Sequence, residues 1–82
     1  MQKIIEVRFG SDSLLKEAEK LSCIRYLNRI LSGLQDDIIS NKGYVNVISK
    51  KGSAVNITFV SNNNELNKRV TLKLFNSSSH QY

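Results

Sequence analysis

The positive charge of this 82-residue chain is concentrated in its second half. The chain carries 12 basic and 7 acidic residues, for a formal net charge of +5. Residues 1–39 hold six of each kind, whereas residues 40–82 hold six basic residues against a single acid, Glu65. Cations grouped in this way can bind phosphate groups or an acidic protein surface. The basic residues of the second half are Lys42, Lys50, Lys51, Lys68, Arg69 and Lys73.

Residues suited to catalysis are few and scattered. The only histidine, His80, lies close to the C-terminus, so a Ser-His or Cys-His arrangement on the folded core is not expected. Asp36 and Asp37 are adjacent and point about 100° apart on a helix. No carboxylates have the spacing of a metal-binding loop, and Cys23 is the single cysteine. We therefore predict a protein that is not an enzyme and needs no metal or other cofactor.

Four segments alternate apolar and polar residues, which is the pattern of a strand with one wet face. They are residues 3–9, 44–49, 54–60 and 68–75. Between the second and third, Lys50 to Ser53 has the length and the glycine of a hairpin turn. The apolar face of the predicted sheet consists of Ile5, Val7, Phe9, Val45, Val47, Val55, Ile57, Phe59, Val70, Leu72 and Leu74.

The opposite face of the predicted sheet combines cations, amides and aromatic rings. Nucleic-acid-binding sheets use this mixture, because cations contact phosphate, amides contact base edges and rings stack on bases. A solvated antiparallel face is also polar by default, so both interpretations stay open. The residues expected on this face are Glu6, Arg8, Tyr44, Asn46, Asn56, Thr58, Arg69, Thr71, Lys73 and Phe75.

Residues 13–40 have a helical pattern with two apolar stripes that do not line up. At about 100° per residue, Leu14, Ala18 and Leu21 share one face, and a second stripe lies about 130° away. We predict two helices, 12–21 and 23–40, with a bend near Ser22. The alternative is one long helix whose first stripe is buried against a partner or a second copy. Gly33 costs about 1 kcal/mol relative to alanine inside a helix and indicates close packing or a local distortion. The second stripe consists of Leu27, Leu31, Leu34 and Ile38.

These elements predict an α+β fold, a two-layer sandwich in the order β-α-α-β-β-β. The last three strands form an antiparallel meander, the N-terminal strand joins one edge, and the helices cover one face. Residues 1–75 make one domain, and residues 76–82 form a C-terminal tail.

Cysteine usage and hydropathy bear on the compartment. A single cysteine cannot form an intramolecular disulfide, which fits a reducing environment. The N-terminus lacks the apolar region of a signal peptide, and no apolar run approaches a membrane span. We expect a cytoplasmic protein, in a cell or in an infected host cell, with no membrane partner.

Two functional hypotheses follow from the charge distribution. The first is a small binding protein that engages nucleic acid or a nucleoprotein through the basic C-terminal meander. The second is an inhibitor or adaptor, of the kind that phages and mobile elements encode, which docks on an acidic surface of a larger protein. The residues expected to bind are Arg8, Lys42, Tyr44, Lys50, Lys51, Lys68, Arg69 and Lys73.

Self-association is a third possibility. A homodimer could form through the stripe of Leu14, Ala18 and Leu21, or through an open edge of the sheet.

Overall fold

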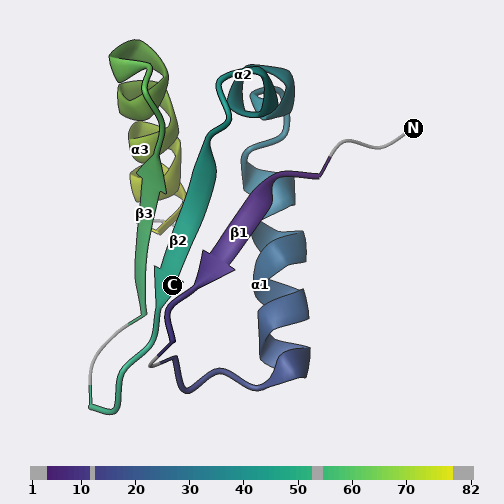
Figure 1. Cartoon of the computed structure of the whole chain (residues 1–82), viewed down its shortest axis with the longest axis vertical. Coiled ribbons are helices and arrows are strands. Elements are labelled where there is room, and N and C mark those ends of the chain that lie inside the picture. Colours follow the sequence, from purple (N-terminus) through teal and green to yellow (C-terminus); the bar gives the residue numbers. More distant parts are fainter. Residues whose placement is uncertain (1–3, 12, 53–54, 79–82) are drawn as a thin grey trace.

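The chain folds in the order β-α-α-β-β-α, in a computed structural model that describes residues 4–11, 13–52 and 55–78. Figure 1 shows the arrangement, and the predicted α+β class is confirmed. In chain order the elements are β1 (Glu6–Phe9), α1 (Glu17–Ile30), α2 (Gln35–Ser40), β2 (Tyr44–Ile48), β3 (Asn56–Val60) and α3 (Asn64–Ser78).

The three strands form one mixed sheet in the order β1-β2-β3. β1 is parallel to β2, with Glu6 opposite Tyr44, and it lies at one edge as predicted. β3 is antiparallel to β2, as the predicted hairpin requires. Gly52 in the hairpin has a φ of 78°, a left-handed conformation that glycine adopts without steric cost.

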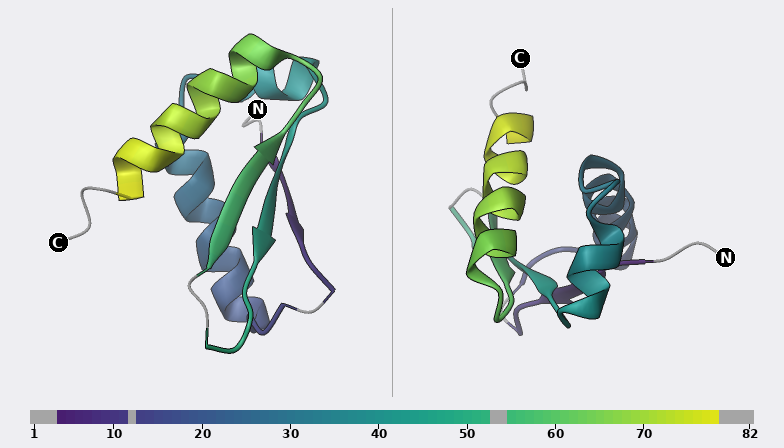
Figure 2. Two further views of the ribbon diagram at one scale, coloured as in Figure 1. Left: turned by 90° about the vertical axis from the view of Figure 1, so that its left-hand side faces the viewer. Right: turned by 90° about the horizontal axis from the view of Figure 1, so that it is seen from above.

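All three helices cover the same face of the sheet, so the predicted two layers are confirmed (Figure 2). The pleat of the strands directs alternate side chains into the space between the layers. Val45 and Val47 of β2 are fully buried there, and Phe59 of β3 is nearly so. The second stripe of the helical region packs against them, and its four residues, Leu27, Leu31, Leu34 and Ile38, are all buried as expected.

Residues 64–78 form helix α3, so the strand predicted at 68–75 is wrong and the meander is reduced to the β2-β3 hairpin. The segment allows both interpretations. Val70, Leu72 and Leu74 alternate as in a strand, but Leu66, Val70 and Leu74 have the i, i+4 spacing of a helix face. Leu66 and Val70 are 2% and 0% exposed, whereas Leu72 is 61% exposed. The helix is favoured because it buries Leu66, which a strand at 68–75 leaves in a loop.

The helical region divides into two helices, but at residues 31–34 and not near Ser22. Gly33 has a φ of 95°, so this glycine makes the turn that lets α2 change direction. The buried residues Leu31 and Leu34 stand on either side of it, which keeps the apolar stripe in the core across the break. The distortion indicated by Gly33 is therefore the break itself.

The first apolar stripe stays uncovered because α1 is continuous through Ser22 and begins only at Glu17. Leu14 is 59% and Leu21 is 54% exposed, and Ala18 is exposed as well. Leu14 precedes the helix, where its backbone N–H donates to the carbonyl oxygen of Ser49 at 3.1 Å. Self-association through this stripe remains a prediction.

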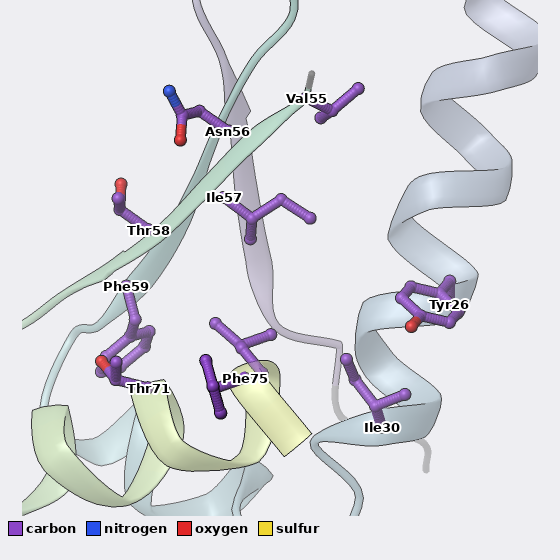
Figure 3. Close-up of a pocket in the computed structure, with 10 residues that line it drawn as sticks. Tyr26, Ile30, Val55, Asn56, Ile57, Thr58, Phe59, Thr71 and Phe75 are labelled. Carbon is purple, nitrogen blue, oxygen red and sulfur yellow. The ribbon is translucent and has the colours of Figure 1, made fainter. Parts of the chain in front are cut away.

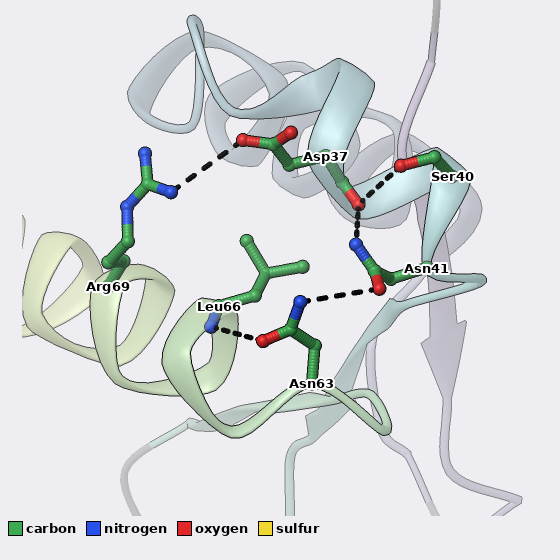
Figure 4. Close-up of polar contacts among 6 residues, drawn as sticks. All are labelled: Asp37, Ser40, Asn41, Asn63, Leu66 and Arg69. Carbon is green, nitrogen blue, oxygen red and sulfur yellow. Dashed lines mark hydrogen bonds and ion pairs between the residues drawn. The ribbon is translucent and has the colours of Figure 1, made fainter.

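The start of α3 is joined to the end of α2 by a chain of polar contacts (Figure 4). Asn63 caps α3, because its Oδ1 accepts from the N–H of Leu66 at 3.1 Å, a contact worth about 1 kcal/mol. Its Nδ2 donates to Oδ1 of Asn41 at 3.4 Å, and Asn41 in turn donates to the carbonyl oxygen of Asp37 at 2.7 Å. The carboxylate of Asp37 pairs with Arg69 at 3.7 Å, so α3 is fixed beside α2.

None of the described helices combines the length and the hydropathy needed to cross a membrane. α3 continues to Ser78, so residues 76–78 of the predicted tail are helical. Residues 79–82, including His80, lie outside the described residues.

Candidate nucleic-acid interface

The face of the sheet turned away from the helices is covered by no described element, and we call it the open face (Figure 2). The register aligns its side chains in rows across the strands. One row contains Glu6, Tyr44 and Val60, and the next contains Arg8, Asn46 and Thr58. Together with Ile48 and Asn56, these six residues make up the open face.

Arg8 and Tyr44 form a stacked pair on the open face. The guanidinium carbon of Arg8 lies 3.7 Å from the centroid of the Tyr44 ring. Its Nε donates to Oε2 of Glu6 at 2.5 Å, and this hydrogen bond is the main reason why the pKa of Arg8 is raised above its usual value. The side chains of Arg8 and Glu6 are both 55% exposed, so the ion pair adds little stability. Its effect is to hold a flat cation over the ring.

Three lysines lie near the two ends of β2. Lys42 precedes the strand in a left-handed conformation, with a φ of 54°, and its side chain is exposed. Lys50 and Lys51 follow the strand in the hairpin and are exposed as well. Because a strand rises about 3.3 Å per residue, Lys42 stands at most about 26 Å from Lys50 and about 30 Å from Lys51 along β2. The neutral Glu6–Arg8 pair therefore lies between two positive ends.

The other three predicted cations belong to the helical layer. Lys68, Arg69 and Lys73 are on α3, so they do not extend a basic sheet surface as the sequence led us to expect. Arg69 faces α2, where it pairs with Asp37. The structure thus brings Arg8 and Tyr44 together on the open face, places Lys42, Lys50 and Lys51 next to the ends of β2, and separates all five from the α3 cations. Thr71 and Phe75, also expected on the open face, lie on α3 too.

Nucleophiles and metal ligands do not converge in the described part of the chain. No group of three histidine, cysteine or carboxylate side chains among residues 4–11, 13–52 and 55–78 could hold a metal ion. Cys23 on α1 is half-buried, and its burial raises the pKa of the thiol. A raised pKa keeps the thiol protonated at neutral pH, which makes Cys23 a poor nucleophile.

A groove of about 460 Å³ lies between α1, β3 and α3 (Figure 3). Its walls are mostly apolar, and the hydroxyl of Tyr26 contacts Ser77 Oγ at 2.9 Å where α1 approaches α3. Phe75 in its wall is 68% exposed, and Leu72, also on α3, is 61% exposed. The sequence analysis did not predict this groove, because it assigned residues 68–75 to a strand. The i, i+4 spacing of Leu66, Val70 and Leu74 was the signal for the helix that forms one wall of the groove. The groove is lined by Tyr26, Ile30, Val55, Asn56, Ile57, Thr58, Phe59, Thr71, Leu74 and Phe75.

Comparisons with protein-family models, with curated proteins and with solved structures found no match to this chain.

Proposed function

We propose that the protein binds single-stranded nucleic acid on the open face of its sheet. The observation that carries this proposal is the stacked Arg8–Tyr44 pair on an uncovered sheet, with lysines beyond both ends of the central strand. The groups are of the types that such binding uses, and the lysines adjoin the two ends of the strand that carries Tyr44.

Bases would stack at the Arg8–Tyr44 pair. Single-strand binding surfaces place unstacked bases on aromatic rings and on guanidinium planes, and the pair offers both. The amides of Asn46 and Asn56 and the hydroxyl of Thr58 are the neighbouring donors and acceptors for base edges. A broad sheet face can contact the unstacked bases of a single strand, whereas it does not fit into the groove of a duplex. The open face therefore favours single strands over double strands.

Phosphates would contact the lysines at the ends of β2. The middle of the face is neutral because Glu6 offsets Arg8, so it would accept bases without attracting phosphate. Lys42 at one end and Lys50 with Lys51 at the other would then hold the backbone as it enters and leaves the face. We place this activity in the cytoplasm, of a cell or of an infected host cell, where the free Cys23 stays reduced.

Salt dependence tests the electrostatic part of the proposal. Three phosphate contacts on a single strand predict a slope of about −2 for log affinity against log salt. The measurement is fluorescence anisotropy with labelled single-stranded and duplex oligonucleotides at several salt concentrations. Tyr44→Leu is expected to weaken binding about 5- to 150-fold through lost stacking, whereas Tyr44→Phe keeps the ring and most of the affinity.

Charge reversal at matched positions locates the site. Lys50→Glu with Lys51→Glu and Lys68→Glu with Lys73→Glu change the net charge by the same amount, at the hairpin and on α3 respectively. Only the hairpin variant is expected to abolish binding. Equal losses in both variants, or no binding by the native protein at low salt, would contradict a site on the open face.

A second candidate is docking on an acidic protein surface through the α3 cations. Lys68 and Lys73 are exposed there and lie in the layer opposite the open face. If this candidate is right, a partner captured from lysate survives nuclease treatment and is lost in the α3 variant, while the hairpin variant keeps it.

A further inference from the structure

The two edges of the sheet differ in how they are protected. Edge strands commonly carry charged residues or proline, which prevent pairing with another chain. β1 has Glu6 and Arg8 at one edge. β3 has the sequence Asn-Ile-Thr-Phe-Val, with no charge and no proline, and within the described residues it pairs only with β2. Backbone N–H and C=O groups of alternate β3 residues therefore point to an unprotected edge.

Exposed apolar side chains surround this same edge. Val55 and Val60, next to and within β3, are 48% and 40% exposed, and Leu72 and Phe75 on α3 are more exposed still. Figure 2 shows α3 on the β3 side of the molecule, and Phe75 and Ile57 line one groove (Figure 3). Phe75 also lines a neighbouring hollow with Leu72, so the open edge and these apolar residues adjoin one another on a surface that we call the β3 edge.

We infer that the β3 edge pairs with the β3 edge of a second copy of the chain, forming a two-fold symmetric dimer with a continuous six-stranded sheet. The strands would be antiparallel, with Thr58 on the symmetry axis. An axis perpendicular to the sheet keeps both helical layers on the same side. It also brings the two α3 helices toward each other, with Phe75 of each copy nearest the seam.

The residues of β3 are complementary to themselves in this register. Ile57 lies opposite Phe59 of the second copy on the inner face, which is a favourable β-branched and aromatic pair. Thr58 lies opposite Thr58 of the second copy on the open face, and threonine pairs are favourable there too. Asn56 lies opposite Val60. No charged residue is in β3, so pairing of the two strands places no cation opposite another. On α3, Lys68 is exposed and lines one hollow with Leu72 and Phe75.

The available area favours a second copy over a short peptide. Stable interfaces bury about 800 Å² on each partner. A buried aromatic ring alone removes about 150–250 Å² from water, and Phe75 is 68% exposed. Leu72, Val55 and Val60 add to this area only if the occupant reaches both the strand and α3, as another copy of this domain does. A peptide recognised by charge would find no cation in β3.

Sedimentation velocity over a wide range of protein concentration tests the dimer without any oligonucleotide, so the result is independent of nucleic-acid binding. The native chain is expected to dimerise reversibly. Thr58→Lys places two like charges face to face on the axis and is expected to weaken dimerisation at least about ten-fold. Phe75→Ser, in the other half of the surface, is expected to weaken it as well. Ser32→Lys adds the same charge at an exposed turn on the β1 side and is expected to leave the dimer intact.

Cross-linking tests the register. In a Cys23→Ala background, Thr58→Cys brings two sulfurs together on the axis, where paired Cα atoms are about 4.5–5.5 Å apart. Oxidation is expected to give a covalent dimer, since disulfides need Cα atoms within about 7 Å. Asn56→Cys is the control, because its two copies stand four residues apart, about 13 Å along the strands.

Three outcomes would overturn the inference. The chain remains a monomer at millimolar concentration, or Asn56→Cys cross-links as readily as Thr58→Cys. The third outcome is a dimer that Leu21→Ser dissociates and Thr58→Lys leaves intact. That result would assign self-association to the first apolar stripe, which contains Leu21.

Discussion

Replacing Leu66 with alanine is expected to lower the free energy of unfolding by about 2–5 kcal/mol, the range for a leucine removed from a packed core. The same substitution at Leu72, six residues further along the same helix, is expected to change it by less than about 0.5 kcal/mol. Leu66 is 2% exposed and Leu72 is 61% exposed, although the residue type, the helix and the lost helix propensity are matched. The difference between the two variants therefore measures burial alone.

Urea unfolding followed by circular dichroism measures both variants, at a protein concentration low enough for the chain to be monomeric by sedimentation velocity, because Leu72 also belongs to the inferred dimer surface. The expected result is a lower midpoint for Leu66→Ala with an unchanged slope, and a curve for Leu72→Ala that overlaps the native one. If Leu72→Ala costs as much as Leu66→Ala, residues 64–78 do not present the face that the structure gives them. A strand at 68–75 would produce that result, because it buries Leu72 beside Val70.

Replacing Gly43 with alanine is the second large expected loss, about 1–3 kcal/mol. A Cβ atom at this position would lie 2.6 Å from Cζ and 3.0 Å from Cε1 of Phe59, whose ring is buried. The backbone cannot move away easily, because the N–H of Gly43 donates to the carbonyl oxygen of Ile38 at 2.8 Å. The cost is one of space rather than of backbone conformation, so a smaller neighbour should relieve it.

A double-mutant cycle with Phe59→Leu tests that explanation. In the Phe59→Leu background, Gly43→Ala is expected to cost at least about 1 kcal/mol less than in the native chain. Gly10→Ala is the control, because a Cβ there meets only Cγ1 of Ile48 at an ordinary 3.5 Å. Additive effects of the two substitutions would show that contact with the Phe59 ring is not what excludes a side chain at position 43.

The strands were predictable because their alternation had one interpretation. In β1, Glu6 and Arg8 alternate with Val7 and Phe9, so only one face can be buried. The hairpin followed from the short, glycine-containing link between two such segments. Local pattern and tertiary burial agreed in these elements, and the sequence was sufficient.

The helical segments failed where the local pattern allowed two solutions. Residues 68–75 satisfy a period of two as well as part of a helical period, and Leu66 outside that window decided between them. The break was expected where the apolar stripe shifts, near Ser22, and it occurs at Gly33. The shift of the apolar stripe did not require a break near Ser22, because Leu14 and Leu21 stay exposed. The turn between the helices needs a residue that adopts a left-handed conformation, and Gly33 is that residue.

The candidate site was predictable residue by residue but not as a group. Arg8 and Tyr44 are 36 positions apart, and their contact depends on the parallel register that sets Glu6 opposite Tyr44. No turn or spacing in the sequence encodes a parallel register. The α3 cations were assigned to the sheet only because the α3 segment was assigned to a strand.

The two strand pairs of the sheet also differ in the conformational entropy that is lost when the chain between their strands is closed into a loop. Glu6 and Tyr44 are separated by 38 positions, whereas Ile48 and Asn56 in the hairpin are separated by 8. Closing the longer loop costs on the order of 1 kcal/mol more. We expect β1 to join a hairpin that has already formed and to leave it first. Native-state hydrogen exchange would then show smaller opening free energies for β1 amides than for those shared by β2 and β3.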